Sequence, residues 1–243
     1  VEEIRQNVSV PFERALAMPP SVYTSEDLLA HELRDIFAQD WFCVGRATAL
    51  SKPGDYVTVE LAGQAIIVLR NKEGQLRAMS NVCRHRMSTL LEGRGNKSSI
   101  VCPYHAWTYN LDGSLRGAPA MTRNDGFCKE DYQLPEVRCE EWLGWVFVTL
   151  NPEAGPVAGQ LAKVEDLVGD YDMGAYTETF FETHVWNTNW KVLAENFMES
   201  YHLPVCHAGT IGGASDLNQM ECPEGEAAFN HHWIIKNDLV PLA

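Results

Sequence analysis

Two short runs of sequence decide the fold: Cys83-Arg-His85 and, after sixteen intervening residues, Cys102-Pro-Tyr-His105. Each run carries one cysteine and one histidine. Two thiolates and two imidazoles on paired loops hold either a tetrahedral zinc ion or a two-iron cluster in which the cysteines bind one iron and the histidines the other. The C-x-H spacing is tighter than the usual zinc-finger pairing, so the spacing favours the iron–sulfur cluster, with structural zinc as the alternative.

The residues around these runs have the pattern of short strands. Val57, Val59 and Leu61 alternate with polar residues, which is the period of a half-buried strand. Asp112-Gly113 stands between two further strand-like segments, as at the corner of a hairpin. We therefore expect an all-β unit over residues 41–150.

The residues before this unit predict a helix. Thr24 is a candidate N-cap, and apolar residues recur at helical spacing over about 25–39. We expect an N-terminal arm with a docking helix over residues 1–40. On the other side, residues 151–159 are rich in Pro, Gly and Ala and predict a domain boundary.

Residues 151–243 form the third expected unit. The pattern predicts a strand over 177–186, then a helix that begins at Asn187–Asn189 and is stopped by Pro204. His202 and His207 are five residues apart, so on a continuous helix they would diverge by about 140°. They can share a metal only if the helix breaks between them, and Pro204 supplies that break.

Two neutral imidazoles and one carboxylate on one face of ferrous iron leave the opposite face open for dioxygen and substrate. His202 and His207 are therefore candidate iron ligands. The alternative is a solvated polar helix face, on which Glu199 and His202 are ordinary surface residues.

These motifs resemble a known family. Cys83-Arg-His85-Arg86 with Cys102-Pro-Tyr-His105-Ala-Trp107 is similar to the Rieske iron–sulfur proteins, and specifically to the Rieske-type non-haem iron oxygenases of the ring-hydroxylating alpha-subunit family. The segment from Glu195 to His207 resembles the mononuclear-iron segment of the same oxygenases. The resemblance runs from about residue 41 to the end of the sequence.

The resemblance implies an α+β fold. An all-β Rieske domain would be followed by the start of an antiparallel-sheet-and-helix (helix-grip) catalytic domain, incomplete in this chain. In the family the third iron ligand, a carboxylate, comes from much farther along the chain, so we expect it beyond residue 243. The acidic residues available within the sequence are alternatives of lower weight: Asp216, Glu221, Glu224, Glu226 and Asp238.

The resemblance also assigns residue roles. It makes the four residues of the two runs, Cys83, His85, Cys102 and His105, the ligands of a Rieske 2Fe-2S cluster. Glu199 would bridge the iron-bound His202 to His105 of the next subunit, which implies a homotrimer. Asn196 is a candidate near the iron, although in many members the asparagine stands one residue farther from the acid.

Some residues depart from the pattern. The family usually has glycine where this chain has Met87 and Ala106, so if those positions need a positive φ, the loop geometry must differ. Respiratory Rieske proteins have a serine hydroxyl at the position of Trp107, and cysteines at those of Ser88 and Tyr104. In those proteins the two cysteines bridge the loops, and this chain cannot form that bridge. With fewer hydrogen-bond donors to the cluster sulfurs, we expect a reduction potential toward the low end of roughly −150 to +300 mV.

The implied function is that of an oxygenase component. A reductase, with or without a ferredoxin, would pass electrons from NADH or NADPH to the cluster and then to the iron, where O2 hydroxylates a small organic substrate. The 195–202 segment resembles oxygenases that demethylate quaternary ammonium compounds such as glycine betaine, carnitine or stachydrine. Aromatic-ring hydroxylation is the runner-up, and a Rieske electron carrier without oxygenase activity is the alternative from another class.

Composition limits the partners. The 243 residues include 19 basic and 33 acidic side chains, a net charge of −14, which disfavours nucleic acid and anionic lipid surfaces. The longest apolar stretches are far shorter than the roughly 20 residues of a membrane helix, so no membrane span is expected. Seven cysteines at irregular spacing predict a reducing compartment, the cytoplasm.

Overall fold

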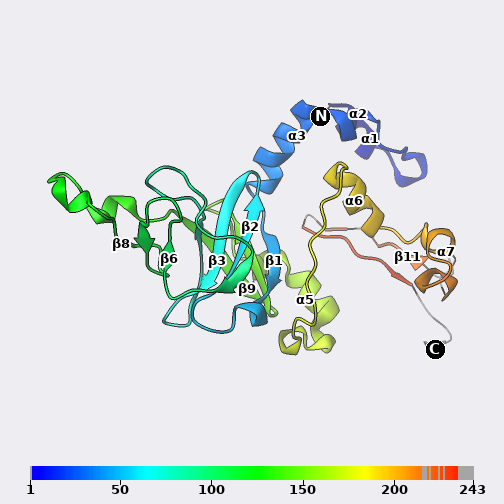
Figure 1. Ribbon diagram of the computed structural model, residues 1–243. Coiled ribbons are helices and arrows are strands. Elements are labelled where there is room, and N and C mark those ends of the chain that lie inside the picture. The colour runs from blue at the N-terminus through cyan, green and yellow to red at the C-terminus, as the bar shows by residue number, and fades with distance from the viewer. Residues whose placement is uncertain (1, 215–217, 219, 224, 227, 235–243) are drawn as a thin grey trace. The chain divides into compact units, whose positions relative to one another are not determined.

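The computed structural model describes residues 2–214, 218, 220–223, 225–226 and 228–234 (Figure 1). The chain divides into two compact units. One consists of Leu29–Phe181, and the other combines Val1–Leu28 with Glu182–Ala243. No helix of the described residues is both long enough and apolar enough to cross a membrane.

The helix expected over about 25–39 is present in two parts. The helical segments before the sheet are α1 (Glu2–Val8), η1 (Phe12–Arg14), α2 (Ser21–Thr24), α3 (Glu26–Glu32) and η2 (Leu33–Phe37), the last being a π-helical turn. The predicted cap at Thr24 is wrong by one residue. Ser25 Oγ accepts the N–H of Leu28 at 3.2 Å, whereas the Thr24 hydroxyl donates to Pro20 O.

A seven-stranded antiparallel sheet forms the centre of the larger unit (Figure 1). Its order is β1 (Phe42–Arg46), β10 (Trp145–Thr149), β9 (Glu136–Trp142), β4 (Leu76–Ser80), β3 (Gln64–Arg70), β2 (Asp55–Leu61) and β5 (Arg94–Asn96). The short helix η3 (Ala47–Leu50) follows β1. Side chains along β3 point alternately to the two faces of the sheet and belong to two hydrophobic cores. Ile66 and Val68 pack in one core, and Ile67 and Leu69 pack in the other.

A smaller three-stranded sheet carries the second motif. It consists of β6 (Ile100–Val101), β7 (Thr108–Tyr109) and β8 (Leu115–Gly117), followed by η4 (Met121–Arg123) and η5 (Lys129–Tyr132). The predicted hairpin corner at Asp112-Gly113 is confirmed, with the N–H of Gly113 donating to Asn110 O at 3.0 Å. Both motif cysteines belong to the same buried core as Ile67 and Leu69.

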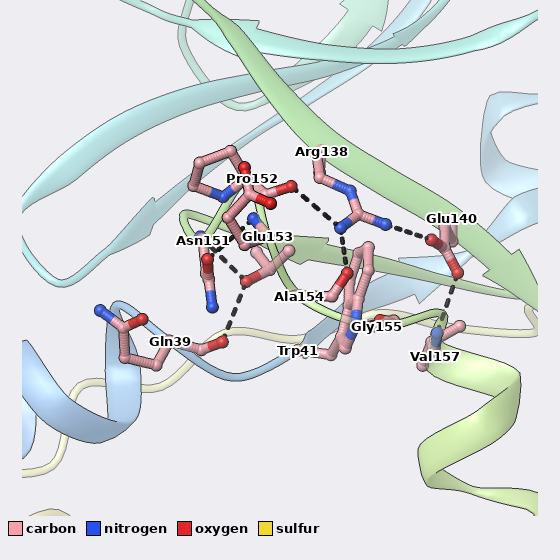
Figure 2. Close-up of polar contacts among 11 residues, drawn as sticks. Gln39, Trp41, Arg138, Glu140, Asn151, Pro152, Glu153, Ala154, Gly155 and Val157 are labelled. Carbon is pink, nitrogen blue, oxygen red and sulfur yellow. Dashed lines mark hydrogen bonds and ion pairs between the residues drawn. The ribbon is translucent and has the colours of Figure 1, made fainter.

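The segment after β10 lies on the same unit. It contains α4 (Val157–Gln160), α5 (Ala162–Val168), η6 (Gly169–Tyr171) and η7 (Met173–Ala175). Figure 2 shows how its first residues are held: Arg138 of β9 donates to the carbonyl oxygens of Pro152, at 3.2 Å, and Ala154. Glu140 accepts the N–H of Val157 at 2.9 Å. The Pro- and Gly-rich segment is therefore fixed to the sheet by specific hydrogen bonds.

The smaller unit contains α6 (Trp190–Phe197), α7 (Leu203–Cys206), η8 (Ile211–Ala214), β11 (Met220–Glu221) and β12 (Trp233–Ile234). As predicted, Asn189 caps α6, and its Oδ1 accepts the N–H of Lys191 at 3.0 Å. The strand predicted over 177–186 is wrong. Those residues have no regular secondary structure, and Glu178 contacts an arginine side chain instead of a neighbouring strand.

Pro204 also differs from the prediction. It lies in the first turn of α7, where its missing N–H has no helical partner to lose, so it starts a helix and does not stop one. The predicted break between the two histidines is also wrong, because the chain leaves the helix earlier, at residues 198–202, and α7 itself lies between His202 and His207.

Candidate metal centres

Two loops with matching backbone hydrogen bonds present the Cys and His pairs. The first follows β4 and the second joins β6 to β7. The N–H of Cys83 donates to Ser88 O at 2.9 Å, and the N–H of Cys102 donates to Trp107 O at 2.8 Å. Each cysteine is thus bonded to the residue five places after it. The loops form equivalent turns although their histidines stand at different offsets.

The residue four places after each cysteine has left-handed backbone geometry. Met87 and Ala106 both have φ of +56°, and their N–H groups donate to the carbonyls of Cys83 and Cys102 at 3.1 and 3.0 Å. Both positions therefore have a positive φ in this chain. Residues with a Cβ adopt the glycine conformation, at a cost of roughly 1–2 kcal/mol each that the closing hydrogen bonds offset.

A buried asparagine closes the base of the first loop. The Asn81 side chain donates to Leu91 O at 2.8 Å and accepts the N–H of Leu91 at 2.9 Å. Val82 and Thr89 form a β-bridge inside this closure. These contacts hold the loop that presents Cys83 and His85.

The four predicted cluster ligands lie together. The ring centroids of His85 and His105 are 4.7 Å apart, and Cys83 and Cys102 are 1% and 3% exposed. The Nδ1 atoms of both histidines are buried and have no hydrogen-bond partner among the described residues. Two buried thiols beside two orphaned ring nitrogens are the donor set that a two-iron cluster with mixed ligands requires. The residues present fit such a cluster.

The electrostatics of the site favour metal-binding protonation states. Burial, together with the neighbouring His105 and Arg86, lowers the pKa of His85, which favours the neutral imidazole. Burial alone would raise the pKa of Cys102. Hydrogen bonds, chiefly from the backbone N–H groups of Tyr104 and His105, outweigh that effect and hold the pKa of the thiol below its usual value.

Two aromatic residues complete the surroundings of the cysteines and histidines. Trp107 is buried, and its ring stacks on His85 with centroids 4.8 Å apart and planes 3° from parallel. The Tyr109 oxygen lies 3.3 Å from Cys83 Sγ and accepts the N–H of Arg84 at 3.0 Å, and when Cys83 is a thiolate the tyrosine is the donor to sulfur. Sequence reasoning missed this donor. The sequence feature that could have identified Tyr109 is the alternation of side chains along a strand, which places it on the same face as Trp107.

The second pair of histidines flanks α7: His202 comes directly before this helix and His207 directly after it. The ring centroids of His202 and His207 are 5.4 Å apart. Glu199 Oε1 contacts His202 Nδ1, and Glu199 Oε2 accepts the N–H of His202 at 3.2 Å. Burial alone would raise the pKa of Glu199, but these hydrogen bonds hold it below its usual range. The carboxylate orients His202 and leaves its Nε2 for a metal.

Among the described residues, no third His, Cys, Asp or Glu side chain joins His202 and His207 to complete a site for a metal ion. Glu221 accepts the indole N–H of Trp233 at 2.9 Å. Asp216, Glu224 and Asp238 lie outside the described residues. Asn196 is exposed on α6.

Two family models match the chain. Residues 40–138 match the Rieske [2Fe-2S] domain, and residues 170–237 match the ring hydroxylating alpha subunit (catalytic domain). The predicted combination of a Rieske domain followed by a catalytic domain is confirmed.

Curated relatives are oxygenase subunits. The carnitine monooxygenase oxygenase subunit of Acinetobacter pittii is 36% identical over 219 residues, which cover 86% of this chain and 57% of that protein. The subunit of the same name from Escherichia coli is 38% identical, with 81% and 54% covered. The glycine betaine monooxygenase oxygenase subunit of Chromohalobacter salexigens is 31% identical, with 88% and 48% covered. The chain spans about half the length of these relatives.

Solved structures of Rieske oxygenases are also similar to this chain. The quaternary ammonium Rieske monooxygenase CntA in complex with L-carnitine has a TM-score of 0.78 and 34% identity, covering 86% of this chain and 60% of that one. Naphthalene 1,2-dioxygenase from Rhodococcus sp., bound to indole, has a TM-score of 0.77 and 25% identity, covering 92% and 54%.

Proposed function

The chain belongs to the family that joins a Rieske [2Fe-2S] domain to a ring hydroxylating alpha subunit catalytic domain, and from this membership we propose that it acts in the oxygenase component of a quaternary ammonium monooxygenase. The observation that carries the proposal is the pair of buried thiols beside two orphaned imidazole nitrogens. The residues that would hold the cluster are Cys83, His85, Cys102 and His105, and those that would hold iron are His202 and His207.

When bound, the cluster supplies electrons one at a time and ferrous iron supplies dioxygen activation. The residues of this chain prepare both sites. Trp107 and Tyr109 exclude water from the buried side of the cluster loops, because both side chains are at most 2% exposed. Glu199 holds the proton on His202 Nδ1, which fixes the tautomer that leaves Nε2 free for a metal.

The names of the relatives support a quaternary ammonium substrate, since they include carnitine and glycine betaine monooxygenase subunits. Hydroxylation would insert one oxygen atom of O2 into a C–H bond next to the cationic nitrogen. The other atom would become water with two electrons and two protons. If the carbon is an N-methyl group, the hydroxymethyl product breaks down to a tertiary amine, formaldehyde and a proton, which is an N-demethylation.

The partners follow from the same proposal. NADH or NADPH would supply the electrons through a reductase, with or without a ferredoxin. The working assembly would be a homotrimer in which Glu199 faces His105 of the next chain. The seven cysteines at irregular spacing fit a reducing compartment, and we place the protein in the cytoplasm.

Oxygen uptake and product analysis test the substrate class. The protein, reconstituted with iron, sulfide and a reductase, is mixed with carnitine, glycine betaine, stachydrine or an aromatic acid. We expect uptake with a betaine and release of formaldehyde. Release of trimethylamine instead of formaldehyde would show that the hydroxylated carbon is not an N-methyl carbon. A cis-diol from an aromatic acid would replace the proposal with ring dioxygenation, the activity named for naphthalene 1,2-dioxygenase.

Metal analysis tests the proposal against an electron carrier or a zinc protein. An oxygenase chain should contain more than two irons, and the excess should disappear in the variant that lacks His202 and His207. Two irons that are unaffected by this change would indicate a carrier. Zinc without acid-labile sulfide would indicate a structural zinc site.

A further inference from the structure

Arg46, the last residue of β1, is a buried arginine whose partners are carbonyl groups. Its side chain is 5% exposed, and it donates to Leu143 O at 3.1 Å, to Met173 O at 2.9 Å and to Tyr176 O at 2.5 Å. The guanidinium lies over the ring of Trp145, 4.7 Å from its centroid. Among the described residues Arg46 forms no ion pair, so the carbonyls and the ring face compensate its charge.

The carbonyls of Met173 and Tyr176 belong to the linker, which we define as residues 169–181. The linker is the last part of the larger unit, and the chain passes into the smaller unit at residue 182. It contains the short turns η6 and η7 but no strand or α-helix. Arg46 therefore holds a segment that the sheet does not hold by strand pairing.

A second arginine holds the far end of the linker. Arg94 of β5 binds both carboxylate oxygens of Glu178, at 2.5 and 3.3 Å, and lies 3.5 Å from the ring centroid of Phe181. The N–H of Glu178 donates to the Thr48 hydroxyl at 3.4 Å. Because Arg94 comes directly after the first cluster loop, this contact ties the end of the linker to that loop.

The turn between β9 and β10 is shaped to accept the guanidinium. Gly144 has φ of +76°, and a Cβ built on it would lie 2.5 Å from Arg46 Nη2. Only glycine lets the arginine sit against this turn. Replacing Gly144 by alanine therefore displaces Arg46 without changing the arginine itself.

We propose that Arg46 is a positioning residue that fixes the linker to the cluster-bearing unit. Electron transfer between two redox centres depends steeply on their geometry, so we expect a released linker to slow the transfer from the cluster of one chain to the iron of the next. The effect on electron transfer rests on the proposed function. The fixing of the linker by Arg46 can be measured whether or not that function is correct.

Hydrogen exchange measures the linker directly. Its reporters are three hydrogen-bonded amides: Ala175 to Asp172 O, Tyr176 to Met173 O, and Glu178 to Thr48 Oγ1. In Arg46→Met and Gly144→Ala we expect these amides to exchange about tenfold faster or more. The matched control is Arg70→Met, because Arg70 is also a largely buried arginine but donates to Leu50 O and approaches Glu141, outside the linker.

Stopped-flow reoxidation measures the consequence. Reduced protein is mixed with O2 and substrate, and loss of the reduced-cluster signal is followed. We expect Arg46→Met and Gly144→Ala to slow this step several-fold while the midpoint potential and the spectrum of the reduced cluster stay as in the parent. Arg70→Met should match the parent.

Unchanged exchange in Arg46→Met would overturn the proposal, as would equally fast exchange in Arg70→Met. Faster exchange with an unchanged reoxidation rate would reject the positioning role. If the parent itself shows no substrate-dependent reoxidation, the proposed function fails, while the exchange rates still decide whether Arg46 holds the linker.

Discussion

Tyr109→Phe isolates one hydrogen bond to a cluster ligand. The hydroxyl oxygen lies 3.3 Å from Cys83 Sγ, and the side chain is 0% exposed. Phenylalanine keeps the ring and its packing, and water cannot replace the lost donor in this buried position. Because Cys83 is a thiolate when it binds iron, the tyrosine must be the donor.

The size of the effect follows from the charge on sulfur. A hydrogen bond to a charged group contributes about 1.5–3 kcal/mol. Reduction adds one negative charge to the cluster, so the donor stabilises the reduced form more than the oxidised form. If the difference is about 1 kcal/mol, the midpoint potential of Tyr109→Phe falls by about 40 mV, because about 59 mV corresponds to a tenfold change for one electron.

A redox titration of the reconstituted protein measures this shift, with the visible spectrum of the cluster as the signal. The matched control is Tyr132→Phe, because Tyr132 packs against Trp107 with ring centroids 5.2 Å apart. That variant also loses one tyrosine hydroxyl, from a residue that contacts Trp107 and, among the described residues, makes no hydrogen bond to a cysteine, and we expect its potential to equal that of the parent. A potential in Tyr109→Phe equal to or above that of the parent would refute the reasoning.

Three further perturbations have defined outcomes. Glycine at Met87 or Ala106 should raise the free energy of unfolding by about 0.5–1 kcal/mol, because each residue has φ of +56°; a lower value in urea unfolding would contradict this. Asn81→Leu leaves the N–H and C=O of Leu91 unpaired and should lower the free energy of unfolding by about 2–4 kcal/mol. The variant should also bind less iron and sulfide per chain, and an iron and sulfide content equal to that of the parent would contradict the role of Asn81 in closing the loop. Hydrogen bonds from the side chain and backbone of the nearby serine hold the pKa of Asp112 below its usual range, so its stabilising effect is complete above about pH 4 and is lost as the pH falls through the lower folded-state value. Asp112→Asn should therefore flatten the acid limb of stability against pH, and an unchanged limb would refute this.

The parts of the fold that the sequence predicts correctly are those with a local physical signature. The alternation at Val57, Val59 and Leu61 corresponds to β2, and the Asp112-Gly113 turn lies between β7 and β8. The Cys and His pairs were recognisable because the spacing of ligands on a loop is itself a chemical constraint. Asn189 could be identified as a cap because the cap bond is made within two residues.

The errors occur where tertiary contacts decide. The pattern over 177–186 favours a strand, but a strand needs a neighbour, and Arg94 binds Glu178 instead. Pro204 is compatible with both the end and the start of a helix, and the turn at 198–202 settles which. Local sequence contains no information about either choice.

The contacts of Tyr109 and Arg46 were also beyond sequence reasoning. Tyr109 reaches Cys83 across 26 positions, and Arg46 reaches Met173 across 127. Strand alternation places Tyr109 on the same face as Trp107, but each contact also depends on how two segments distant in sequence pack together, which periodicity alone does not determine. The residues that adjust the site are therefore harder to predict than the residues that form it.

Pulsed electron paramagnetic resonance of the reduced, reconstituted protein tests the central claim most directly. We predict a signal from a two-iron cluster with hyperfine coupling to two imidazole nitrogens, and loss of one coupling or of the whole cluster in His85→Ala and in His105→Ala. A reduced protein that contains iron and sulfide but shows no nitrogen coupling, or one that binds only zinc, would contradict it.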